Sequence, residues 1–148
     1  MACSADDMAK SRDLRVRGFQ FTVDIVRLCR EHLASDPIIR RLAYQLVESA
    51  GSIGANLEES GAGQTKPDFI AKQAISLKEA RESRFWLRVL AAAYPPAAPT
   101  LASHLQESTE LVAMITASIL TAKSNPHRGE PPTPPETHGD GGDMDGKW

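Results

Sequence analysis

The chain has 148 residues, 41% of them hydrophobic, which is enough for one domain with a buried core. Its formal net charge is -2: residues 12–124 carry fourteen Lys or Arg and twelve Asp or Glu, whereas residues 125–148 carry two and five. A surplus of two positive charges on the folded part does not by itself indicate a nucleic-acid-binding module. Two cysteines suggest neither a disulfide framework nor a metal cluster. Neither a secretory signal nor a long apolar stretch is recognisable, so we expect a cytoplasmic protein.

The first predicted helix begins near Ser11 to Asp13 and ends at about Leu33, because apolar residues recur there every three or four positions. It is the most basic helix of the chain. Its arginines form a candidate anion-binding face: Arg12, Arg15, Arg17, Arg27 and Arg30. The alternative, which is the more common case for such charges, is a solvated outer surface.

The second predicted helix runs from about Pro37 to Ser60, since proline suits a first helical turn and restricts the residue before it. Two glycines in its interior each cost about 1 kcal/mol relative to alanine. We therefore expect a neighbouring helix backbone, that of the third helix, to approach them closely. The predicted contact surface, between helices or between subunits, comprises Gly51, Ser52, Gly54, Ala55 and Asn56.

The third predicted helix covers about Lys66 to Ala93, with Thr65 as its N-cap. Two carboxylates, Glu79 and Glu82, fall within an otherwise apolar stripe and would need partners if buried. The candidates are Arg81 or Arg84 on the same helix, Asn56 on the second helix, or groups of another subunit. The predicted core of this helix comprises Phe69, Ile70, Ala74, Leu77, Leu87 and Leu90.

The segment Tyr94-Pro95-Pro96 ends the third helix, and a fourth restarts at Pro99 or Thr100 and continues to about Lys123. Four helices with short connections predict an all-α, up-down-up-down four-helix bundle over residues 12–124. Residues 1–11 and the acidic, Pro- and Gly-rich residues 125–148 lack apolar periodicity, so we expect both to be disordered.

Motifs that carry catalytic chemistry are not found. No Glu-x-x-His pair for a di-metal bundle site occurs, and the Gly-Ser-Ile-Gly-Ala-Asn run lies inside a helix rather than after a strand. Ser49, Ser52 and Ser83 have no nearby histidine to serve as a base. We therefore predict no enzymatic activity, no cofactor and no metal ion.

Two stretches carry a family resemblance. The runs QLVESAGSIGANLEE (residues 45–59) and DFIAKQAISLKEARESRFWLRVL (residues 68–90) resemble the small four-helix-bundle proteins that include those encoded by intervening sequences in large-subunit ribosomal RNA genes. The resemblance implies a ring-shaped homopentamer without known catalysis. It also implies a polar network that holds helices or subunits together, formed by Glu59, Lys78, Glu79, Arg81 and Glu82.

A relative in the same fold family is the accessory variability protein of diversity-generating retroelements, a basic pentamer that binds a reverse transcriptase and RNA. Many relatives have a basic residue near Glu48 and an arginine near Gln64, and this sequence departs from both. We therefore expect a non-catalytic homo-oligomeric scaffold or adaptor that binds itself and a protein partner. The alternative is a nucleic-acid-binding accessory protein with RNA, DNA or a reverse transcriptase as partner. No membrane partner is expected.

Overall fold

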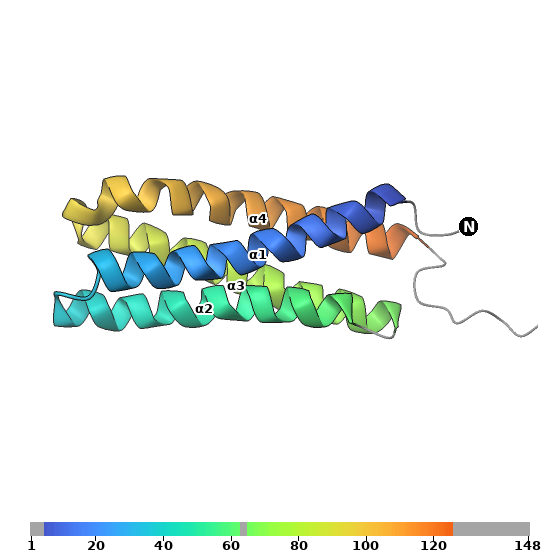
Figure 1. The fold of residues 1–148 in the computed structure, drawn as a ribbon, viewed down its shortest axis with the longest axis horizontal. Coiled ribbons are helices and arrows are strands. Elements are labelled where there is room, and N and C mark those ends of the chain that lie inside the picture. Colours follow the sequence, from blue (N-terminus) through green and yellow to red (C-terminus); the bar gives the residue numbers. More distant parts are fainter. Residues whose placement is uncertain (1–4, 63–64, 126–148) are drawn as a thin grey trace, which may run out of the picture.

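The structure, a computed structural model, describes residues 5–62 and 65–125, with side chains from residue 12 onward. Over these ranges the chain forms α1 (Ala5–His32), α2 (Pro37–Gly61), α3 (Lys66–Ala93), the 3-10 turn η1 (Pro95–Ala97) and α4 (Ala98–Ser124). The helices run alternately up and down along one long axis (Figure 1), and contacts join α1 to α2, α2 to α3, α3 to α4 and α4 to α1. The predicted all-α four-helix bundle is confirmed.

Local sequence explains where the two middle helices begin. Asp36 caps α2, because its Oδ1 accepts hydrogen bonds from the backbone N–H groups of Ile38 at 2.8 Å and Ile39 at 3.0 Å. Thr65 caps α3 in the same way through the N–H of Asp68. A proline lies in the first turn of each helix, where its missing N–H costs nothing.

The outer helices differ from the sequence prediction at their starts. α1 begins at Ala5, before the predicted start near Ser11 to Asp13, because residues 5–10 contain good helix formers and neither glycine nor proline. α4 begins at Ala98, since η1 leads directly into it. The remaining parts of the predicted disordered ends, residues 1–4 and 126–148, lie outside the described residues. None of the described helices is apolar over enough of its length to cross a membrane.

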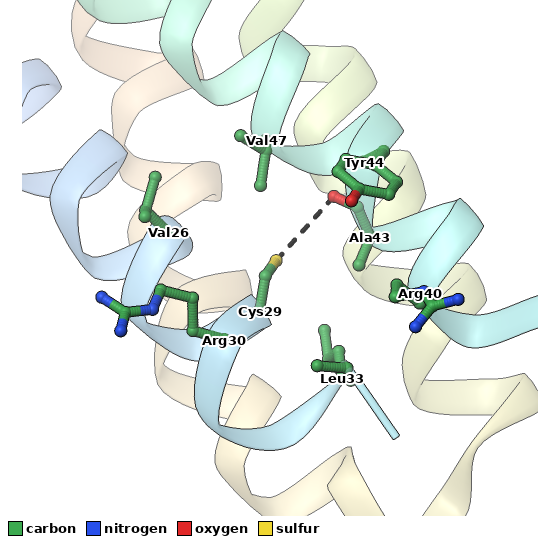
Figure 2. Close-up of a pocket in the computed structure, with 9 residues that line it drawn as sticks. Val26, Cys29, Arg30, Leu33, Arg40, Ala43, Tyr44 and Val47 are labelled. Carbon is green, nitrogen blue, oxygen red and sulfur yellow. Dashed lines mark hydrogen bonds between the residues drawn. The ribbon is translucent and has the colours of Figure 1, made fainter. Parts of the chain in front are cut away.

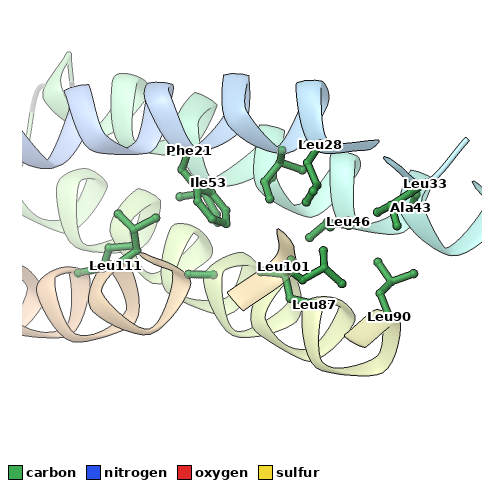
Figure 3. Close-up of a cluster of buried hydrophobic side chains, with 14 of the residues drawn as sticks. Phe21, Leu28, Leu33, Ala43, Leu46, Ile53, Leu87, Leu90, Leu101 and Leu111 are labelled. Carbon is green, nitrogen blue, oxygen red and sulfur yellow. The ribbon is translucent and has the colours of Figure 1, made fainter. Parts of the chain in front are cut away.

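Apolar side chains from all four helices fill the centre of the bundle (Figure 3). Phe21 of α1, Ile53 of α2, Leu87 of α3 and Leu111 of α4 are each almost fully buried. The predicted core of α3 is only partly right, since Ile70 and Leu77 are half-buried and Ala74 is exposed. The positions that α3 buries instead are Gln73, Ser76, Ala80 and Ser83, together with the predicted Phe69, Leu87 and Leu90.

Candidate functional site

The interior glycine Gly54 of α2 packs against α1. It is buried, and a Cβ built on it would lie 2.9 Å from Thr22 Oγ1 and 3.4 Å from the carbonyl oxygen of Gly18. Thr22 Oγ1 in turn lies 3.0 Å from the carbonyl oxygen of Gly18 and 2.8 Å from that of Ala50, to which it donates across the two helices. The expected close approach of a helix backbone to Gly54 therefore exists, but the helix that approaches is α1, and the prediction that it is the third helix is wrong.

Gly51 and Ala55 lie on the side of α2 that faces the surface, away from the contact between Gly54 and α1. A Cβ on Gly51 would meet nothing within 4 Å, and Ala55 is exposed. Because Gly18 and Gly54 touch, their neighbours Phe19 and Ala55 lie at the same level on the outside of the bundle. We call this surface the α1–α2 outer face; it comprises Val16, Phe19, Val23 and Val26 of α1 with Tyr44, Val47, Gly51 and Ala55 of α2.

The two polar residues of the predicted contact surface bond within their own helix. Asn56 Nδ2 donates to the carbonyl oxygen of Ser52 at 2.8 Å and to its Oγ at 3.2 Å, and both side chains are half-buried. One turn further along, Glu59 forms an ion pair of 2.5 Å with Lys72 of α3. Glu59–Lys72 is therefore an ion pair between α2 and α3 at this level, and Lys72 was not among the residues predicted from the sequence.

The two carboxylates of α3 are half-buried on the bundle surface. Glu82 Oε1 accepts a hydrogen bond of 3.3 Å from Trp86 Nε1. Desolvation by burial, and then the charge of Glu82, raise the pKa of Glu79, whereas nearby Lys78 lowers it. Within the described residues no hydrogen bond or ion pair joins any two of Glu59, Lys78, Glu79, Arg81 and Glu82, so the predicted polar network does not form inside one chain.

One of the five arginines of the predicted anion-binding face forms ion pairs within the bundle instead of lying free on the surface. Arg17 is bound by α4, with Nε 3.0 Å from Glu107 Oε1, and with Nη2 2.8 Å from Glu107 Oε2 and 2.5 Å from Glu110 Oε2. These contacts raise the pKa of Arg17 and lower that of Glu110. In the described part of the chain the other four have no ion-pair partner: Arg12, Arg15, Arg27 and Arg30.

A groove of about 250 Å³ opens between α1 and α2 at the end of the α1–α2 outer face (Figure 2). Its wall is almost wholly apolar and includes Val26 and Tyr44. Cys29 lies inside the groove with its Sγ 3.8 Å from the carbonyl oxygen of Ala43, and burial raises its pKa to about 11. Arg30 projects from α1 and Arg40 from α2 at its edges.

A row of buried polar groups between α2 and α3 was not predicted from the sequence. Ser49 Oγ and Ser83 Oγ are 2.8 Å apart, Ser76 donates to the carbonyl oxygen of Ile53 at 3.1 Å, and Gln73 Nε2 donates to Ser60 Oγ at 3.2 Å. Small hydroxyl side chains let the two helices approach closely, and these hydroxyl groups are hydrogen-bonded to one another or to backbone carbonyl oxygens. In the described part of the chain, buried Gln73 Oε1 has no hydrogen-bond partner. The sequence does contain a pattern that could have revealed this buried row. Positions 73, 76, 80, 83, 87 and 90 follow a heptad-like spacing, and the first four are polar or small whereas the last two are leucines.

The described residues contain no group of three or more His, Cys, Asp or Glu side chains that could hold a metal ion. The structure presents three candidate surfaces: the exposed apolar α1–α2 outer face, the groove with two arginines at its edge, and the half-buried carboxylates Glu79 and Glu82 on α3. Such features define a small helical-bundle protein whose candidate sites are interaction surfaces.

The comparisons with known proteins identify the family. The model of the 23S rRNA-intervening sequence protein family matches residues 12–117, and the chain belongs to this family. The resemblance found in the sequence is thereby confirmed. A crystal structure from Bacteroides thetaiotaomicron, of a protein with unknown function from the S23 ribosomal protein family, is similar with a TM-score of 0.66. It is 29% identical over 75% of this chain and 98% of its own. No curated protein matches the sequence.

Proposed function

We propose that the chain is a non-catalytic scaffold whose copies associate through the α1–α2 outer face. The observation that carries this proposal is the exposure of large apolar side chains on that face: Phe19 is 62% exposed, Tyr44 63% and Val16 60%. Single exposed apolar residues are common, but a contiguous set of them is typical of an interaction site. The open Gly51 and Ala55 beside them leave room for another backbone to approach.

The assembly that we propose is the closed homopentameric ring implied by the family resemblance. A ring needs a head-to-tail interface in which two different surfaces of each subunit meet. The second surface that suits this role is on α3, where Ile75 is 41% exposed and Phe85 52% exposed beside the half-buried Trp86. Glu79 and Glu82 lie on the same helix, so a neighbouring subunit with exposed arginines would supply cationic partners for both carboxylates. A protein partner would then bind the outside of the ring.

Light scattering of the purified protein at micromolar concentration tests the assembly. We expect a particle of about five times the 16.1 kDa chain mass, and we expect Phe19→Glu to reduce it to the single-chain mass, because burying an unpaired carboxylate is costly. The matched control is Leu120→Glu on α4, since Leu120 is 61% exposed but lies outside the proposed faces. A monomeric wild-type protein, or equal dissociation by both substitutions, would reject the proposal.

A second candidate function, an accessory protein that binds RNA, is supported by the unpaired arginines of α1. We would measure binding of a structured RNA across a salt series for Arg27→Gln/Arg30→Gln and for the control Arg84→Gln/Arg88→Gln on α3. Loss of two phosphate contacts should weaken binding and reduce the slope of log K against log salt by about two. No binding at low salt, or equal effects of the two variants, would count against RNA binding.

A further inference from the structure

The groove between α1 and α2 combines an apolar wall with a basic edge. Val26, Cys29 and Tyr44 contribute to the wall, and Arg30 and Arg40 contribute its two charged groups. Neither guanidinium group has an ion-pair or hydrogen-bond partner among the residues that the structure describes. Two unneutralised cations beside an apolar surface favour an occupant that supplies both carboxylates and a large apolar side chain.

The chain itself contains a segment with that composition. Residues 126–148 hold five Asp or Glu against two Lys or Arg, and their only large apolar side chains are Met144 and Trp148. Asp140, Asp143 and Asp145 surround Met144 and precede Trp148 closely. The segment is therefore complementary to the groove in charge and in apolar character.

The length of this segment suits the distance it must span. Leu28 and Thr100 line one groove between α1 and α4, so the antiparallel α4 ends about 24 residues, or roughly 36 Å, further along the bundle. An extended chain covers at most about 3.5 Å per residue, so a 23-residue segment reaches up to roughly 80 Å. Residues near 140–148 can therefore reach the groove, whereas a segment of a third of that length could not.

Charges along the path do not oppose this course, and the groove at its end is basic. Arg12 and Arg15 lie on α1 between the end of α4 and the groove. The opposing carboxylates on the α1–α2 outer face are Glu48 and Glu58 of α2, both exposed. Two arginines and two carboxylates therefore balance along the route, whereas the residues that line the groove include two arginines and no carboxylate.

We propose that residues 126–148 dock on the α1–α2 groove of their own bundle, with carboxylates against Arg30 and Arg40 and Trp148 against the apolar wall. Docking would cover part of the α1–α2 outer face until a stronger partner displaces the segment. The inference goes beyond the scaffold function and does not rest on it, because the groove and the segment belong to one chain.

Alkylation of Cys29 by iodoacetamide reports occupancy of the groove, and the full-length protein with Cys3→Ser makes the readout specific. Rates would be measured by mass spectrometry at a single alkaline pH. If the segment occupies the groove for about four-fifths of the time, labelling is slowed roughly fivefold, since only the open fraction reacts. We therefore expect about fivefold faster labelling when the segment carries Glu136→Gln, Asp140→Asn, Asp143→Asn and Asp145→Asn, and faster labelling with Trp148→Ala.

The labelling rate is also compared between two double variants of the bundle. Arg30→Gln/Arg40→Gln removes the two arginines of the groove, and Arg84→Gln/Arg88→Gln, which removes two arginines of α3, is the control. Loss of positive charge beside Cys29 does not favour its thiolate, so we expect faster labelling of Arg30→Gln/Arg40→Gln only through release of the segment, and we expect no change in Arg84→Gln/Arg88→Gln. Equal rates for the wild-type and neutralised segments would overturn the proposal. Protection that is insensitive to the segment but disappears on dilution would also overturn it, because a second copy would then cover the groove.

Discussion

Replacement of Gly54 by alanine tests the packing of α1 against α2. The added methyl group would lie 2.9 Å from Thr22 Oγ1, and that hydroxyl is held by the carbonyl oxygens of Gly18 and Ala50. Overpacking of this kind costs about 1–3 kcal/mol, and a displaced hydrogen bond costs about 1 kcal/mol more. The higher helix propensity of alanine offsets about 1 kcal/mol. We therefore expect a net loss of about 1–3 kcal/mol in the free energy of unfolding.

The assay is urea unfolding followed by circular dichroism, with Gly51→Ala as the matched control. Gly51 is on the same helix, one turn away, and its added Cβ would meet nothing within 4 Å. Only the helix-propensity gain of about 1 kcal/mol then applies, so the two Gly→Ala substitutions should change stability in opposite directions. Both unfolding curves should be taken at the lowest usable protein concentration, so that subunit association does not contribute.

A third variant separates the steric cause from a general effect of substitution. Thr22→Ser keeps the hydroxyl but removes a methyl group and the rigidity of a branched side chain. In the Thr22→Ser background, Gly54→Ala should cost less than it does in the wild type. A Gly54→Ala protein as stable as the wild type, or a Gly51→Ala protein destabilised equally, would refute the proposed close approach of the two helices.

Two other substitutions carry predictions about charge. Arg17→Gln should lower stability by about 1 kcal/mol through loss of the Arg17–Glu107 pair. Because Arg17 lowers the pKa of Glu110, its stabilisation is present above the ordinary value of 4.5 and is lost as the pH falls through the lowered pKa. In Arg17→Gln the free energy of unfolding should therefore fall less steeply as the pH decreases below 4.5 than it does in the wild type. The same pH dependence in both proteins would contradict this prediction. Burial raises the pKa of Glu79, so ionisation of Glu79 disfavours folding near neutral pH. In the Phe19→Glu protein, in which we expect no assembly, Glu79→Gln should raise the melting temperature at pH 7 and not below pH 4.5. In the assembled protein we expect a loss at pH 7 instead, because the proposed interface supplies a cationic partner for Glu79; equal gains in both proteins would contradict that partner.

The bounds of the helices show which structural features can be predicted from local sequence alone. α3 runs from Lys66 to Ala93, as predicted, because its cap at Thr65 and its stop at the two prolines after Tyr94 act through neighbours in the chain. The start of α1 at Ala5 was missed for a related reason. Its first residues lack an apolar stripe, and only their intrinsic helix propensity indicates a helix there.

The candidate surfaces were harder to predict. The periodicity of α2 places Gly54 on a buried face, but it does not say which of two neighbouring helices meets that face. Arg17 looks like Arg12 and Arg15 in the sequence, yet it faces α4 and binds carboxylates about ninety residues away. The buried Ser49–Ser83 contact is likewise invisible until α2 and α3 are placed together.

The amino-acid sequence by itself determined that this chain forms four amphipathic helices, because capping, helix propensity and a repeat of three to four residues act within one or two turns. Only the tertiary structure decided which helix meets Gly54, which arginine is neutralised and which apolar residues stay outside. Those outcomes depend on the lateral order and axial rotation of the packed helices, and many distant contacts fix that arrangement together.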